Sequence, residues 1–437
     1  MSVPAPALRL AEFIDASPTP HHATESARRM LAEAGFIERD PTESWSGAEP
    51  SAGSGAEPSF VVRDGSLIAW AGATAPDAPL RMIGAHTDSP NLRIRPRPDT
   101  GLAGFRQLGV EVYGGALVNS WLDRDLGLAG RVAVRAGDGS VGHELFRSDR
   151  AVLRVPQLAI HLDRDITTTG LLLNKQQHLT PVWGLGDPVA GDFRTWLAGE
   201  VGVDPAEVLS WDAACFDVQP SAPLGDDMDL LAAPRLDDLC SCWGAVRALI
   251  HATTESNAPS HASVVVLNDH EEVGSTTATG AAGDWLAQVL ERRALALGGD
   301  RSDLLRSLAM SHLLSADMAH GTHPNYPERH EPNHWIRLGG GPVIKHNPNA
   351  RYATDDTGAA LFVLACEAAA VPYQQYSHRG DLACGSTIGP ITAAALAINT
   401  VDVGMAQLSM HSSRELMATS DVDAMERSFT SWFTTAH

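Results

Sequence analysis

The chain has 437 residues, more than one hydrophobic core usually holds, so we expect one large domain and a smaller one. Hydrophobic residues make up 44% of the sequence, which suits a packed globular protein and argues against global disorder. The formal net charge of -21 argues against a nucleic-acid-binding surface.

Cysteine usage and hydropathy predict a cytoplasmic protein. The closest of the five cysteines, Cys240 and Cys242, are spaced too tightly for a CxxC site, and an odd number favours a reducing compartment. The first residues, MSVPAPALRL, lack a basic region followed by an apolar stretch. No segment has about 18 uninterrupted apolar residues, so we expect no membrane partner.

The first ninety residues predict two helices, a hairpin and a strand that ends in polar residues. The predicted elements are helices at Leu8–Ala16 and His22–Ala34 joined by a turn at Ser17–His22, a surface loop at Ser46–Ser59, a hairpin at Phe60–Trp70 turned at Asp64 and Gly65, and a strand at Arg81–Asp88. His86 and Asp88 share one face of that strand, so the carboxylate can orient a metal-binding imidazole. Taken alone, either residue could equally cap a turn.

From residue 91 to residue 234 short apolar runs alternate with Gly, Asp and Pro. Strands are expected at Gly109–Val118, Arg131–Ala136 and Ala151–His161, and irregular helix at Asp187–Asp212. Strands without interposed helices predict an antiparallel β module inserted into another domain.

After Pro234 helices and strands alternate as in an α/β sheet. We expect strands at Ala262–Leu267, up to Asp317 and at Pro372–Tyr376, and helices near Trp285–Ala296, Asp356–Ala369 and Pro390–Asn399. A last helix, with Ser420 as its N-cap, carries Val422, Met425, Phe429 and Trp432 at core spacing.

The stretch Val264–Ser275, VVVLNDHEEVGS, indicates an active site. A β-branched strand ends in Glu271 and Glu272, and adjacent side chains at a strand end point in different directions. One carboxylate can therefore bind a metal while the other faces the attacking water. An isolated EE pair is more often a solvated turn, but other polar groups also follow apolar segments: His86, Asp88, Asp237, Asp238, Asp317 and His411. Oxygen and imidazole ligands without cysteine suit a catalytic zinc, manganese or cobalt site.

The sequence closely resembles the M18 family of metallo-aminopeptidases, the aspartyl aminopeptidases. The matching motifs span most of the chain: SPTPHHA (Ser17–Ala23), GAHTDSPNLRIRP (Gly84–Pro96), WLDRDLGLAGRV (Trp121–Val132), PQLAIHLDRD (Pro156–Asp165), PRLDDL (Pro234–Leu239), DHEEVGS (Asp269–Ser275), SADMAHGTHPNY (Ser315–Tyr326), RYATDDTGA (Arg351–Ala359) and MHSSRE (Met410–Glu415). The resemblance implies an α/β fold, with a three-layer α/β/α metallo-aminopeptidase catalytic domain built on a mixed sheet. Residues 1–90 and 235–437 would form it, and residues 91–234 an inserted, mainly-β dimerisation domain.

The resemblance also implies the ligands of two divalent ions, most readily Zn²⁺, with Co²⁺ or Mn²⁺ as alternatives. Asp237 would bridge both ions, His86 and Asp317 would complete one site, and Glu272 and His411 the other. Glu271 would be the general base on a water that bridges the ions, and Asp88 would orient His86. As in related dinuclear peptidases, we expect a cis peptide between Asp237 and Asp238.

Two further roles follow from the resemblance alone. His161 matches a histidine that reaches the neighbouring subunit's active site and stabilises the oxyanion; otherwise it is a buried structural histidine. Lys345 matches a lysine that pairs with an acidic P1 side chain, although a lysine on a loop is usually solvated. The family further implies dimers assembled into a dodecamer.

The expected activity is release of N-terminal Asp or Glu from peptides with a free N-terminus. Two alternatives remain open: a dinuclear aminopeptidase that prefers neutral residues, and a catalytically silent metal-binding scaffold or trafficking cargo. The sequence decides neither the native metal nor the physiological peptide.

Overall fold

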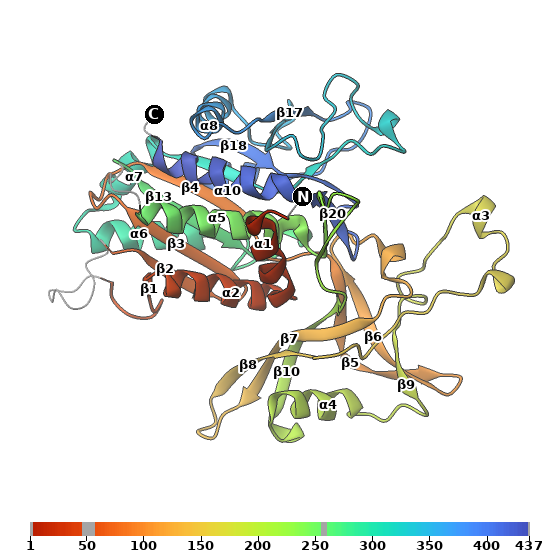
Figure 1. The fold of residues 1–437 in the computed structure, drawn as a ribbon. Coiled ribbons are helices and arrows are strands. Elements are labelled where there is room, and N and C mark those ends of the chain that lie inside the picture. Colours follow the sequence, from red (N-terminus) through yellow and green to blue (C-terminus); the bar gives the residue numbers. More distant parts are fainter. Residues whose placement is uncertain (1–2, 46–56, 255–259, 436–437) are drawn as a thin grey trace.

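The computed structural model describes residues 3–45, 57–254 and 260–435 (Figure 1). Strands in these ranges form three sheets of nine, six and five strands. None of the helices there has the length and apolar character needed to cross a membrane. Most of the predicted loop at Ser46–Ser59 lies outside the described residues.

The nine-stranded sheet is mixed and forms the middle layer of the larger part of the molecule. Its strands, in spatial order, are β1 (Ile37–Glu38), β2 (Ser59–Arg63), β3 (Ser66–Gly72), β13 (Ala262–Asn268), β4 (Leu80–His86), β14 (His312–Ala316), β18 (Asn399–Gly404), β16 (Val343–His346) and β17 (Gln374–Ser377). The central run from β13 to β18 is parallel, so its strands end at the same edge.

Helices cover both faces of this sheet, and β13 shows why. Val265 and Leu267 pack into one hydrophobic cluster, whereas Val264 and Val266 pack into another on the opposite face. The first cluster includes residues of α1 (Ala5–Ala16), α2 (Pro20–Glu33), α5 (Leu236–Thr254), α8 (Asp356–Ala368) and α10 (Thr419–Thr434). The second includes residues of α6 (Trp285–Ala296), α7 (Arg301–Ala309) and α9 (Ile388–Leu396). The predicted three-layer α/β/α arrangement is confirmed.

The six-stranded sheet is antiparallel and has a hydrophobic core of its own. Its strands, in spatial order, are β8 (Val141–Arg147), β7 (Leu126–Arg135), β10 (Val208–Asp217), β5 (Asn91–Leu102), β6 (Phe105–Tyr113) and β9 (Val182–Leu185). Helix α4 (Asp192–Val201) packs Phe193 and Leu197 into this core, while short η1 (Val118–Trp121), η2 (Ile160–Leu162), α3 (Ile166–Thr169) and η3 (Pro205–Glu207) lie in connections. Figure 1 shows the sheet below the three-layer part, with α3 on a long excursion. The division at residues 91 and 234 stays a prediction.

A five-stranded sheet completes the structure. It contains, in spatial order, β11 (Ala222–Leu224), β12 (Leu230–Ala233), β20 (Glu415–Ala418), β19 (Ala406–Leu408) and β15 (Ala319–His320). Two short helices lie in connections: η4 (Glu271–Val273) follows β13, and η5 (Pro327–Arg329) follows β15. All five cysteines are free thiols.

Several predicted elements differ from the structure for local reasons. The predicted strand at Ala151–His161 is wrong: this segment forms isolated bridges and η2, and Pro156 offers no N–H to a ladder. β6 ends at Tyr113 rather than continuing to Val118, because Gly114 takes φ 68°. Asp187–Asp212 contains α4 but passes into β10 at Val208.

The helix boundaries were also predicted imperfectly. α2 begins at Pro20, so the turn before it is shorter than Ser17–His22. The N-cap of α10 is Ala418, and Ser420 lies within its first turn. By contrast, α6 has the predicted bounds, and β2 and β3 form the predicted hairpin, with Asp64 at φ 52° in its turn.

Candidate metal centre

Polar side chains meet at the edge where the parallel strands end. β13 pairs with β4 so that Asn268 lies opposite His86, and β14 runs parallel to β4 on its other side. The residues that follow β13 and β14 include Glu271, Glu272 and Asp317. Open α/β sheets place ligand sites at this edge. The loop before β20 adds His411, and the start of α5 adds Asp237.

Potential ligand atoms of these side chains lie within 4.8 Å of one another in three groups among the described residues. The groups are His86 with Asp237 and Asp317, Asp237 with Glu272 and His411, and His86 with Glu271 and Glu272. The first two share Asp237 and together contain the five ligands that the resemblance implied. The roles of these residues as ligands remain a prediction.

The distances inside the cluster suit bound cations. Nε2 of His86 lies 3.3 Å from Oδ1 of Asp237, and Nε2 of His411 lies 3.3 Å from Oδ2 of the same carboxylate. Nε2 of His411 also lies 3.2 Å from Oε1 of Glu272. Ligands that bind one Zn²⁺ tetrahedrally at about 2.0–2.1 Å are separated by roughly 3.3 Å. Within the described residues, Oδ1 of Asp237 and Oε1 of Glu272 are buried without a hydrogen-bond partner, so the donor set fits metal ions.

The backbone around Asp237 is fixed on both sides. The Asp237–Asp238 peptide is cis, as expected from the resemblance. The carboxylate of Asp238 accepts a hydrogen bond from the backbone N–H of His86 at 3.1 Å, and the Ser89 hydroxyl donates to the carbonyl of Asp237 at 2.7 Å. The loop that carries one ligand is thereby held against the loop that carries another.

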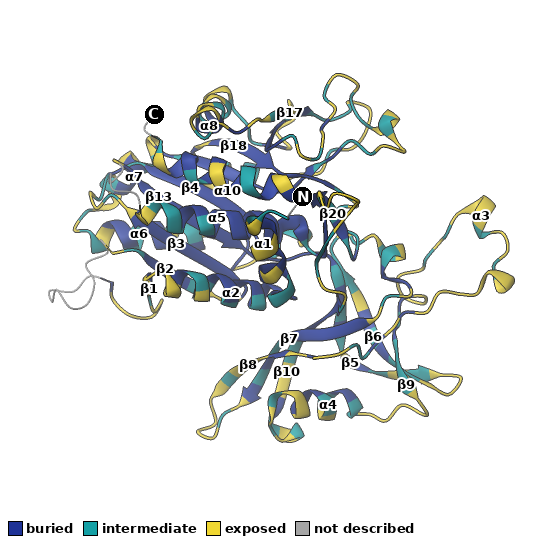
Figure 2. Cartoon of the chain, viewed as in Figure 1, coloured by how far each residue is buried: buried dark blue, intermediate teal, exposed yellow. Residues whose placement is uncertain are grey.

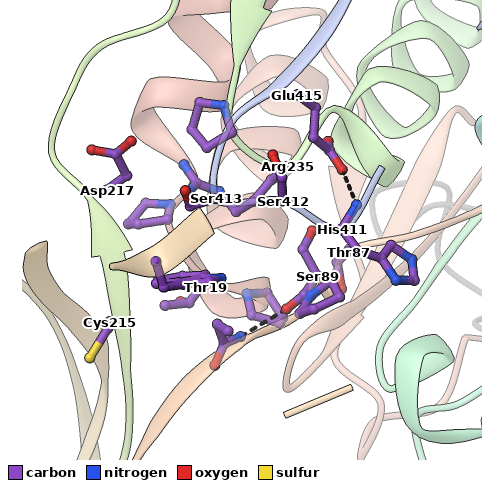
Figure 3. Close-up of a pocket in the computed structure, with 16 residues that line it drawn as sticks. Thr19, Thr87, Ser89, Cys215, Asp217, Arg235, His411, Ser412, Ser413 and Glu415 are labelled. Atoms are coloured by element: carbon purple, nitrogen blue, oxygen red, sulfur yellow. Dashed lines mark hydrogen bonds between the residues drawn. The ribbon is translucent and has the colours of Figure 1, made fainter. Parts of the chain in front are cut away.

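Glu415 ties the remaining ligand loop to Asp237, and sequence analysis assigned it no role. Its Oε1 accepts the backbone N–H of His411 at 2.7 Å, and its Oε2 accepts that of Asp237 at 3.0 Å. Figure 3 shows the contact with His411 beside a cavity of about 20 Å³. That space holds about one water molecule and is too small for a peptide. Only the position of Glu415 four residues after His411 could have hinted at this link.

Asp88 lies behind the cluster and is completely buried. Its backbone carbonyl lies 3.0 Å from Nδ1 of His86, closer than its carboxylate oxygen at 3.5 Å. The carboxylate instead accepts the backbone N–H groups of Glu271 at 3.0 Å and Glu272 at 3.1 Å, and the hydroxyl of Tyr113 at 2.7 Å. Asp88 thus contacts His86, the residue with which sequence analysis paired it, more closely through its backbone carbonyl than through its carboxylate.

The electrostatics show a surplus of acidic groups. Burial, together with the carboxylates of Asp317 and Glu272 and despite nearby His86, raises the pKa of Glu271 to about 8. Burial lowers the pKa of His411, but the nearby carboxylates of Asp237 and Glu272 outweigh it and raise that pKa to about 11. Burial also raises the pKa of Asp317 to about 6, against the effect of Lys345. Divalent cations would neutralise this excess negative charge.

The cluster opens into a cavity of about 370 Å³ that contains Lys345. Lys345 lies on β16 and is 2% exposed, so the alternative of a solvated loop lysine is wrong. Its Nζ donates to the carbonyl of Asp317 at 2.9 Å and lies 5.1 Å from the ring centre of Tyr352. His320 also lines the cavity, and burial and Lys345 lower its pKa to about 4. Sequence analysis missed His320 and Tyr352, although both stand in quoted motifs.

His161 lies elsewhere. It is exposed on η2, in the connection between β8 and β9, and it does not line the cavity of its own chain. The alternative of a buried structural histidine is therefore wrong. A role in a neighbouring subunit remains a prediction.

Comparison with known proteins places this geometry in a family. The family described as Aminopeptidase I zinc metalloprotease (M18) matches residues 13–433. Probable M18 family aminopeptidase 2 of Streptomyces coelicolor is 50% identical over 416 residues, covering 94% of each chain. Its counterpart in Mycobacterium leprae is 48% identical over 435 residues, covering 99% of each chain.

Solved structures agree in fold. A complex of Ape4 and Nbr1 contains a chain with a TM-score of 0.93 and 35% identity, covering 99% of this chain and 87% of that chain. The Saccharomyces cerevisiae mApe1 dodecamer matches with a TM-score of 0.84 and 29% identity, covering 98% of this chain and 96% of that chain. An M18 aminopeptidase of Thermotoga maritima shares the fold, with a TM-score of 0.84 at 21% identity. The chain therefore belongs to the M18 family of zinc metallo-aminopeptidases.

Proposed function

We propose that this aminopeptidase uses two divalent ions, most readily Zn²⁺, bridged by Asp237. His86 and Asp317 would complete one site, and Glu272 and His411 the other. The observation that carries the proposal is that the two oxygens of Asp237 face two different imidazoles, each at 3.3 Å. When bound, the ions supply Lewis acidity for the attacking water and the scissile carbonyl.

Glu271 would act as the general base. Its backbone N–H is held by Asp88, and its carboxylate shares a ligand-distance group with His86 and Glu272. It would take a proton from the attacking water and deliver it to the leaving amine. It is not one of the five proposed ligands, so it is free to move that proton.

Cleavage at the N-terminus would follow from recognition of the free α-amino group. This group would lie against a bound metal ion and a carboxylate of the 370 Å³ cavity, which contains Glu271, Glu272 and Asp317 among its lining residues. An acetylated nitrogen cannot make these contacts. The enzyme would therefore remove single residues and leave N-acetylated peptides intact.

An acidic P1 side chain would pair with Lys345. The buried ammonium group lines the same cavity as the proposed ligands. Within the described residues, its Nζ donates hydrogen bonds to two carbonyl oxygens, those of Asp317 and Met318. A carboxylate there would form a charge-assisted hydrogen bond. Met318, Ile391 and Met410 also line the cavity and would suit a neutral side chain, which is the alternative preference.

Assembly would complete the site through His161. The exposed connection around η2 also presents Leu158, Ile160 and Leu162, which are 58%, 52% and 75% exposed. Exposed apolar residues next to each other mark an interaction surface. The mApe1 relative is described as a dodecamer, and we propose that this chain forms dimers through residues 91–234 and then a dodecamer, in which His161 of the partner subunit stabilises the oxyanion.

The test is release of Asp, Glu, Leu and Ala from aminoacyl anilides by metal-stripped protein, with and without added Zn²⁺, Mn²⁺ or Co²⁺. Metal-dependent release with a preference for Asp or Glu is the expected result. Metal-dependent release of Leu or Ala instead would retain the dinuclear site and reject the role of Lys345. Protein that binds metal yet releases none of the four residues would be a scaffold or cargo protein.

A further inference from the structure

One segment of the six-stranded sheet reaches the metal centre. β6 ends at Tyr113, and the next two residues, Gly114 and Gly115, lie beside Glu272 and His411. The Tyr113 hydroxyl donates to Oδ2 of Asp88 at 2.7 Å. A Cβ atom on Gly114 would lie 3.1 Å from Cβ of Glu272, so the backbone approaches that residue closely.

The same segment also contacts His411. Nδ1 of His411 lies 3.2 Å from the carbonyl oxygen of Gly115, which leaves Nε2 directed at Asp237. The N–H of Leu117 donates to the carbonyl of His411 at 2.9 Å. The hydrogen bond to the second nitrogen of a metal-binding imidazole fixes its orientation.

Tyr113 is itself held by other residues of the six-stranded sheet. The guanidinium of Arg93, on β5, lies 4.2 Å from the centre of the Tyr113 ring and forms an ion pair with Asp212 on β10. Asp212 also lies 3.4 Å from His21 of α2. Burial and the Asp88 carboxylate raise the pKa of the Tyr113 phenol, so the hydroxyl keeps its proton and remains a donor.

We propose that Tyr113 is a positioning residue through which the six-stranded sheet fixes the geometry of the metal centre. Its hydroxyl fixes Asp88, and Asp88 fixes the backbone of Glu271 and Glu272 through two N–H hydrogen bonds. The proposal rests on the proposed function for its effect on turnover. Its effect on metal affinity is independent of any substrate.

The test uses the full-length protein with Tyr113→Phe, which removes one hydroxyl and keeps the ring on Arg93. Groups behind metal ligands typically contribute 10- to 100-fold to metal affinity or activity, and we expect about tenfold weaker Zn²⁺ binding in competition with a chelator. We expect kcat to fall by a similar factor, with KM nearly unchanged, because the base and not the substrate pocket is displaced. Tyr373→Phe, at an exposed tyrosine, is the matched control and should change neither value.

A double-mutant cycle shows whether Tyr113 acts through Asp88. In an Asp88→Ala background the further change Tyr113→Phe should have little effect on Zn²⁺ affinity, because the acceptor that the Tyr113 hydroxyl fixes is gone. Unchanged Zn²⁺ affinity in Tyr113→Phe, or additive effects in the cycle, would overturn the proposal. A wild-type protein without peptidase activity would reject the proposed function, while the Zn²⁺ titrations would still decide the role of Tyr113.

Discussion

Two regions differ in how far a single chain organises them: the edge of the nine-stranded sheet that holds the candidate metal centre, and the connection between β8 and β9. At the sheet edge the predicted ligands form two groups of three that share Asp237, with ligand atoms within 4.8 Å of one another in each group, and His86, Asp237 and Asp317 are buried. In the connection between β8 and β9, His161 is exposed among apolar side chains. Figure 2 shows much of the part of this connection around α3 in yellow, the colour of exposed residues. A site built on strand ends is organised by the fold of one chain, whereas His161 would need a partner subunit to reach such a site.

The largest effect is expected at the sheet edge. Glu271→Gln removes the proposed base but keeps the five proposed ligands. A general base typically contributes 10²- to 10⁴-fold, so kcat should fall by about that factor. Metal content, measured by atomic absorption on the same sample, should match that of the wild type. A variant that is both metal-loaded and fully active would remove Glu271 from the mechanism.

The next effect separates the two regions. His161→Ala should lower kcat by about 10²- to 10³-fold, as removal of an oxyanion donor does. The metal content and the melting temperature of the variant should equal those of the wild type. Mixing unfolded His161→Ala and Glu271→Gln chains and refolding them together should restore part of the activity, because some sites then combine an intact base with His161 of the partner subunit. Each variant refolded alone is the control. Absence of any restored activity in mixed assemblies of native size would contradict action between subunits.

The smallest effect concerns specificity. Lys345→Met should lower kcat/KM for Asp and Glu substrates by roughly 30-fold or more relative to Leu and Ala substrates, because loss of one partner of a buried charge pair costs about 2 kcal/mol or more. The ratio is the informative quantity, since Lys345 also donates to the carbonyl of Asp317. An equal loss for all four substrates would indicate that Lys345 only supports the backbone of Asp317.

The comparison also explains what the sequence could predict. The three-layer fold follows from local periodicity, as in β13, whose successive residues face opposite hydrophobic clusters. Three of the predicted ligands, His86, Glu272 and Asp317, lie together because they end or follow parallel strands whose ends meet at one edge. Asp237 and His411 come from the start of α5 and the loop before β20, and strand order alone does not bring them there. Family resemblance was needed to choose Asp237 rather than Asp238, since both are buried and adjacent.

Other features depend on contacts between distant segments. Glu415 accepts a hydrogen bond from the backbone N–H of Asp237, 178 positions away, and Tyr113 donates one to Asp88, 25 positions away. No local spacing in the sequence indicates either of these two contacts. Lys345 looked like a loop residue because β16 has only four residues. The segment Ala151–His161 was predicted as a strand because it is a short apolar run, but Pro156 interrupts it and its residues form only isolated bridges.

The most direct test of the central claim is a Zn²⁺ titration of metal-stripped protein, followed in parallel by isothermal calorimetry and by hydrolysis of a peptide with a free N-terminus and of its N-acetylated form. We expect two equivalents of bound Zn²⁺ per chain, activity that rises as the Zn²⁺ sites fill, and cleavage only of the peptide with a free N-terminus. Full activity without metal, or equal cleavage of the acetylated peptide, would contradict the central claim.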